Sequence, residues 1–126
     1  MTVNLKEVGG IYFVTYAEHP DYIKIGRTKN YHNRFLSYLT HTPFSLEVLL
    51  LLPRVNSRLW DTPPSSFDER GLHRKFKNQQ YKNEWFHNTE ALRKDIHEQR
   101  TAKEFEAFIF TPEIVSSPVY KMVEEI

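Results

Sequence analysis

Cysteine occurs nowhere in the 126 residues, and its absence excludes several kinds of chemistry. Without it there is no disulfide framework, no thiolate zinc site and no cysteine nucleophile. Long hydrophobic runs are absent too, because the longest, Val48 to Leu52, is too short to cross a bilayer. The first residues, Met1 to Glu7, lack the apolar core of a signal peptide. We therefore expect a cytoplasmic chain with no membrane partner.

Neither sign of charge is in excess, since 17 Lys and Arg residues balance 16 Asp and Glu residues to give a formal net charge of +1. The total charge is no argument for a polyanionic partner, but the basic residues are clustered. The segments 22–34 and 70–82 contain basic residues and no acidic ones. Solvated helix faces explain either cluster about as well as nucleic acid does. The candidates for contacts with nucleic acid in these segments are Arg27, Lys29, Arg70, Arg74 and Lys75.

Hydrophobic residues make up 40% of the chain and aromatic residues 14%, which is sufficient for a packed core. The length suits one domain rather than two. We predict one folded domain over residues 1–104 and a C-terminal extension over residues 105–126.

The hydrophobic spacing predicts a mixed α/β fold. Gly10 to Tyr16 and Tyr22 to Thr28 are rich in β-branched and aromatic residues and are predicted to form an antiparallel hairpin, turning at Ala17 to Asp21. By alternation, Tyr12 shares a face with Val14 and Tyr16, and Lys24 shares one with Tyr22. Next come a helix capped by Asn30 and ending before Pro43, a buried strand over Phe44 to Leu52, and a loop over Arg54 to Ser65. A second helix begins near Ser66, a strand covers Gln80 to Phe86, and a third helix follows Asn88, with a stripe that continues toward Phe108.

Three residues in this order supply what phosphodiester cleavage needs. Tyr12 is a candidate base for activating water, Arg34 a cation for holding phosphate, and Glu69 a carboxylate for binding a metal. Each has a simpler explanation: Tyr12 as a core aromatic, Arg34 as a solvated helix residue, and Glu69 as part of a capping box with Ser66. Only their joint arrangement favours a catalytic site.

The ordered motifs resemble the GIY-YIG nuclease superfamily. Gly10-Ile11-Tyr12 matches the first motif, and Lys24-Ile25-Gly26 and Glu84-Trp85-Phe86 are similar to the phage-associated branch. The resemblance covers roughly Gly9 to Asn88 and implies a central three-stranded antiparallel sheet flanked by helices.

The resemblance implies an endonuclease that hydrolyses DNA, with RNA left open, using Mg²⁺ or Mn²⁺. Tyr12 would activate the attacking water, Arg34 would hold the scissile phosphate, and Glu69 would bind the metal. Two positions depart from the fuller pattern, because Lys24 replaces a tyrosine and Tyr38 occupies a position that is often histidine or tyrosine. Both are counted as catalytic candidates.

Three further side chains are accessory candidates. His73 follows Glu69 by one helical turn, although a packing or hydrogen-bonding role for it is favoured about two to one. Asn83 and Asn88 compete for the polar position near the last strand. Trp85 and Phe86 are predicted as core anchors of that strand.

Two other functions stay open. Lys24 and the balanced charge favour a catalytically weak nucleic-acid-binding module of the same fold. An interaction protein that uses Trp60 and the tail is the third hypothesis. The sequence does not fix the oligomeric state, and cutting both strands from one site requires either a homodimer or two successive nicks.

Overall fold

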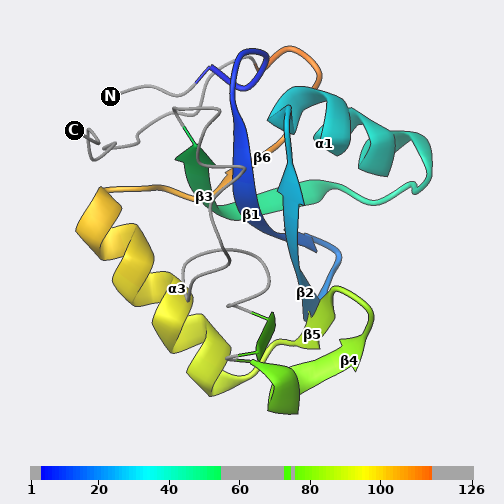
Figure 1. Cartoon of the computed structure of the whole chain (residues 1–126). Helices are drawn as coiled ribbons and strands as arrows, with labels where there is room; N and C mark the ends of the chain where they lie inside the picture. The colour runs from blue at the N-terminus through cyan, green and yellow to red at the C-terminus, as the bar shows by residue number, and fades with distance from the viewer. Residues whose placement is uncertain (1–3, 55–72, 75, 115–126) are drawn as a thin grey trace.

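The computed structural model describes residues 4–54, 73, 74 and 76–114, and shows one mixed α/β sheet structure with two helices (Figure 1). The six strands are antiparallel to their neighbours and lie in the order β4-β5-β2-β1-β3-β6. The helices are α1 (Tyr31–Thr40) and α3 (Glu90–Lys103). The strands are β1 (Gly9–Tyr16), β2 (His19–Thr28), β3 (Leu46–Arg54), β4 (Gln80–Lys82), β5 (Trp85–His87) and β6 (Phe108–Ile109).

The predicted hairpin forms the centre of the sheet, with β1 between β2 and β3. The predicted three-stranded sheet has too few strands, because β4, β5 and β6 extend this centre to a sheet of six. The three added strands have only two or three residues each. Such short segments carry little periodicity, so their pairing depends on the tertiary fold.

The register assigns the central side chains to two faces. Tyr12 is opposite Gly26, and Val14 is opposite Lys24, so all four lie on one face of the sheet. Helix α1 covers this face, where the ring of Phe35 meets Tyr12 edge to face at 5.5 Å. We call it the α1 face. The predicted alternation is therefore confirmed for Tyr12, Val14 and Lys24.

The other face holds Phe13 opposite Ile25 and Ile23 opposite Phe86, all buried. Helix α3 contributes Leu92 and Ile96 to the same core. In Figure 1 the two helices lie on either side of the strands, α1 in cyan and α3 in yellow. Hydrophobic residues thus fill both sides of the central hairpin, which fixes the position of Tyr12 and Lys24.

Helix α1 begins as the sequence predicts. The Asn30 side chain accepts a hydrogen bond from the Asn33 backbone N–H at 2.9 Å, which satisfies one of the free donors of the first turn. The buried Tyr31 hydroxyl donates to the Ile11 carbonyl at 2.9 Å and ties the helix to β1.

Several predicted boundaries need correction. The hairpin turn is only Ala17 and Glu18, because Tyr16 already pairs with His19. The third strand is Leu46–Arg54 rather than Phe44 to Leu52. The predicted strand over Gln80 to Phe86 is a hairpin of β4 and β5, since Asn83 has a φ of 56° and reverses the chain.

The third predicted helix also begins and ends differently. Its cap is Thr89, whose hydroxyl accepts from the Leu92 N–H at 3.2 Å, and not Asn88. It ends at Lys103, because Glu104 adopts a left-handed conformation that stops the stripe short of Phe108. The chain then returns to the sheet as β6, and Phe110 packs edge to face against Phe35.

Part of the prediction falls outside the described residues: the loop with Trp60, the helix beginning near Ser66, and the last residues of the tail. Within the described ranges, neither helix is long and apolar enough to pass through a membrane.

Candidate active site

Two phenol groups meet where α1 crosses the hairpin. The Tyr12 and Tyr38 hydroxyls lie 2.8 Å apart and share a hydrogen bond, and their rings meet edge to face at 6.2 Å. Tyr12 comes from β1 and is only 1% exposed, whereas Tyr38 comes from the third turn of α1 and is partly exposed. The helix thus places Tyr38 between the buried Tyr12 hydroxyl and the surface.

Gly26 creates the space for the Tyr12 ring. A Cβ at position 26 would overlap Cζ and the hydroxyl oxygen of Tyr12 and would lie 2.9 Å from its Cε1. The glycine of the second motif is therefore required because the tyrosine of the first motif lies across its backbone. The two motifs form one structural unit.

Lys24 lies on the same face and contacts the Tyr38 ring of this pair. Its Nζ is 5.0 Å from the centre of the Tyr38 ring and 5.5 Å from that of Trp85, which are distances of cation–π contacts. The same Nζ is 3.6 Å from a carboxylate oxygen of Glu84. The cation of the second motif is thus held between two rings and one acid.

The surroundings keep Tyr38 neutral. Burial raises the pKa of Tyr38 far above its ordinary value, and the adjacent Tyr12 hydroxyl raises it further. The positive charge of Arg34 lowers the pKa of Tyr38 in part, and the negative charge of Glu84 raises it slightly. At neutral pH the Tyr38 hydroxyl therefore keeps its proton and can donate it in a hydrogen bond.

The raised pKa makes folding sensitive to alkaline pH. Because the fold favours the neutral phenol, the stability that Tyr38 contributes is complete below pH about 10, its unfolded pKa, and is lost as the pH rises further. Tyr38→Phe removes this contribution, so we expect a variant about 1 kcal/mol less stable at pH 8. The difference from wild type should shrink above pH about 10.

Urea unfolding at a series of pH values, followed by far-UV circular dichroism, measures this difference. Tyr16, whose pKa burial also raises, is present in both proteins and cancels in the comparison. A difference that stays constant into strongly alkaline pH would show that the fold does not favour the neutral form of Tyr38.

Of the five residues predicted as catalytic, four lie in this region. Tyr38 contacts both Tyr12 and Lys24 as described, and Arg34 is an exposed residue one turn before Tyr38 on α1. The positive charge of Arg34 acts on Tyr38, so the two side chains belong to one electrostatic environment. The fifth, Glu69, lies outside the described residues, as do Arg70 and Lys75.

The accessory candidates have other partners. A ring nitrogen of His73 is 2.9 Å from the Ile25 carbonyl, and its ring packs on Phe86, which points away from the α1 face. The Asn88 amide donates to the Pro20 carbonyl at 2.6 Å, and the exposed Asn83 forms the turn between β4 and β5. These contacts connect elements of the fold.

Among the candidates for nucleic-acid contacts, Arg27, Lys29 and Arg74 are exposed.

The sequence interpretation missed the roles of Glu84 and Trp85. Phe86 is fully buried as predicted, but Trp85 is partly exposed and contacts Lys24 and, at 5.6 Å between ring centres, Tyr16. The signal was available in the alternation, because Trp85 and Phe86 are adjacent on one strand and cannot both face the same core.

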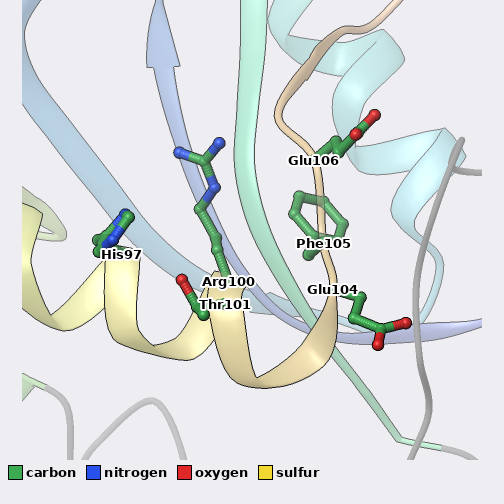
Figure 2. A pocket seen from close by; sticks show the side chains of 6 residues that line it. All are labelled: His97, Arg100, Thr101, Glu104, Phe105 and Glu106. Atoms are coloured by element: carbon green, nitrogen blue, oxygen red, sulfur yellow. The ribbon is translucent and has the colours of Figure 1, made fainter.

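A separate hollow of about 330 Å³ lies at the C-terminal end of α3 (Figure 2). It is lined by His97, Arg100, Thr101, Glu104, Phe105 and Glu106. None of the predicted site residues lines it, and its charges are mixed. We assign no function to it.

A metal ligand set is not visible in the described ranges, where no three His, Asp or Glu side chains gather around one point. Glu84 is a poor ligand because its carboxylate is beside the Lys24 ammonium group. Glu69, the metal ligand predicted from the sequence, lies outside the described residues. One carboxylate suits magnesium, which retains several waters and takes further oxygens from phosphate.

Comparison with known proteins gives one family. The model of the T5orf172 domain matches residues 9–105, from the first residue of β1 to just beyond α3. The curated proteins and the solved structures give no match to this chain. The matched segment contains the Tyr12, Lys24, Arg34 and Tyr38 region described above.

Proposed function

The chain belongs to the T5orf172 domain family, a phage-associated, nucleic-acid-related domain commonly linked to GIY-YIG-like folds, and on that premise we propose that it is a metal-dependent endonuclease acting on DNA. The observation that carries the proposal is the shared hydrogen bond of Tyr12 and Tyr38 at 2.8 Å, with Lys24 over the Tyr38 ring. This arrangement combines a proton acceptor, a donor that stays neutral and a cation in one place.

The phenol pair suits general-base catalysis. Tyr38 keeps its proton, so it can donate to the Tyr12 oxygen and stabilise negative charge there. The Lys24 ammonium group, 5.0 Å from the centre of the Tyr38 ring, adds a positive charge beside this pair. In this proposal the phenolate form of Tyr12 takes a proton from the attacking water and becomes the phenol, and Tyr38 and Lys24 stabilise the phenolate beforehand.

Arg34 and Glu69 complete the proposal. The guanidinium group is always charged and matches phosphate with two parallel hydrogen bonds, which suits an exposed position at the entrance of the site. Glu69 is the proposed ligand of Mg²⁺ or Mn²⁺. When bound, such an ion would supply Lewis-acid stabilisation of charge on the phosphate oxygens.

Nicking of supercoiled plasmid tests the proposal. We expect wild type to nick in magnesium and to bind without cutting in EDTA. Tyr12→Phe keeps the ring packing against Phe35 but removes the hydroxyl, so the nicking rate should fall roughly 100-fold or more while DNA binding is retained. Glu69→Ala should lose cleavage together with the magnesium dependence.

The exposed Lys94→Ala on α3 is the matched control and should nick like wild type. An unchanged nicking rate in Tyr12→Phe would show that the Tyr12 hydroxyl takes no part in the reaction. Metal-independent cleavage by wild type would overturn the metal requirement.

A catalytically weak nucleic-acid-binding module is the second candidate, and two observations favour it. Tyr12 is only 1% exposed, and Lys24 is already paired with Glu84 at 3.6 Å. This alternative predicts salt-dependent DNA binding with no magnesium-dependent nicking by the wild-type protein.

A further inference from the structure

Three aromatic side chains form a cluster at one edge of the sheet. The ring centres of Tyr22 and Tyr81 are 4.5 Å apart, and His87 lies 5.4 Å from Tyr22 and 5.3 Å from Tyr81. The residues come from β2, β4 and β5, so the pairing of remote segments assembles them. We call this cluster the edge platform.

The edge platform is exposed in a way that core packing does not explain. Tyr81 is 57% exposed, and it and Ile109 are the two large hydrophobic residues exposed in the described part of the chain. All three residues of β4 are exposed, and β4 is the last strand of the sheet. An ordered, solvent-facing ring on such a strand offers a flat π surface to a ligand.

The edge platform lies on the α1 face, in line with the candidate active site. Tyr22 pairs with His87, and Lys24, two residues later on β2, pairs with Trp85, two residues earlier on β5. Because side chains alternate, these four lie on the same face as Tyr12. Lys24 contacts both Tyr38 and Trp85, and Trp85 is two residues from His87 on β5, so these two side chains lie between the Tyr12 and Tyr38 pair and the edge platform.

The charges beside the edge platform suit an anion. Lys77 precedes β4 and Lys82 is its last residue, and both are exposed. Glu84, the acid of the hairpin, is beside Lys24. Asp21, an exposed acid next to Tyr22, is the opposing charge. Exposed rings interspersed with lysines are the combination that binds single-stranded nucleic acid, where bases stack on the rings and the cations contact phosphates.

We propose that the edge platform holds an unpaired base of the DNA strand that enters the active site, with Tyr81 as the stacking surface and Lys82 as a phosphate contact. The inference rests on the proposed function and adds a preference for DNA that contains a single-stranded segment. A base on Tyr81 would hold the strand on the face of the sheet that also carries Lys24 and Tyr12.

Fluorescence anisotropy in EDTA and at fixed salt tests the proposal. The probes are a labelled DNA single strand of about 12 nucleotides and an abasic strand of the same length, which has the same phosphates but no bases. Wild type should bind the strand with bases roughly tenfold more tightly. Tyr81→Ala should lose this preference and bind the abasic strand as wild type does, whereas Tyr81→Phe should retain it.

Two further variants separate stacking from charge and from general surface effects. Lys82→Ala should weaken binding of both strands by a similar factor, because it removes a phosphate contact. Ile109→Ala, at the opposite edge of the sheet, should change neither. A full preference for bases in Tyr81→Ala, or no preference in wild type, would overturn the proposal.

The binding experiment and the nicking experiment can fail independently of each other. If wild type prefers the strand with bases but nicks no plasmid in magnesium, the stacking proposal stands and the nuclease proposal fails. If wild type nicks plasmid but does not distinguish the two strands, the reverse holds.

Discussion

Gly26→Ala is expected to destabilise the protein by about 3 kcal/mol, a large part of the stability of a domain of this size. The added methyl would overlap the ring and hydroxyl of Tyr12, which is itself enclosed by Phe35 and Tyr38 and cannot move aside cheaply. Either β2 or the ring must shift. Thermal unfolding measures the effect, and the melting temperature should fall by roughly 10 °C.

A double-mutant cycle with Tyr12→Leu identifies the cause. Leucine lacks the ring atoms that overlap the new methyl, so Gly26→Ala should cost about 1 kcal/mol or less in that background. If Gly26→Ala costs the same in the wild-type and Tyr12→Leu backgrounds, the glycine is needed for its backbone rather than for the tyrosine ring.

The motifs could be predicted from the sequence because they depend on interactions between residues that are close along the chain. Alternation along the two strands of one hairpin determines that Tyr12, Gly26 and Lys24 share a face of the sheet. The Asn30 cap is likewise a local hydrogen bond. Local rules were sufficient for the hairpin and the start of the first helix.

The remaining parts depend on contacts between distant segments. Strands β4 and β5 are three residues long, and β5 joins β2 through the pairing of Ile23 with Phe86, which no local pattern encodes. The ion pair of Lys24 and Glu84 and the edge platform follow from that pairing. Alternation could have shown that Trp85 and Phe86 face opposite ways, but not which partners each one meets.

Arg34, like Tyr12, should give a large loss of activity when it is replaced. Arg34→Ala is expected to lower the single-turnover nicking rate roughly 10²- to 10³-fold, because a preorganised cation at the phosphate is lost. The side chain is exposed on α1, so folding stability should change little. Its charge also lowers the pKa of Tyr38, so the variant should keep Tyr38 neutral even more strongly.

Arg34→Lys separates charge from geometry. Lysine keeps the charge but lacks the two parallel donors, so it should recover only part of the lost rate, roughly tenfold. Lys94→Ala again controls for loss of one exposed cation. A nicking rate within about twofold of wild type for Arg34→Ala would mean that the phosphate is held elsewhere. The region around Tyr12 and Tyr38 would then lack its proposed phosphate clamp.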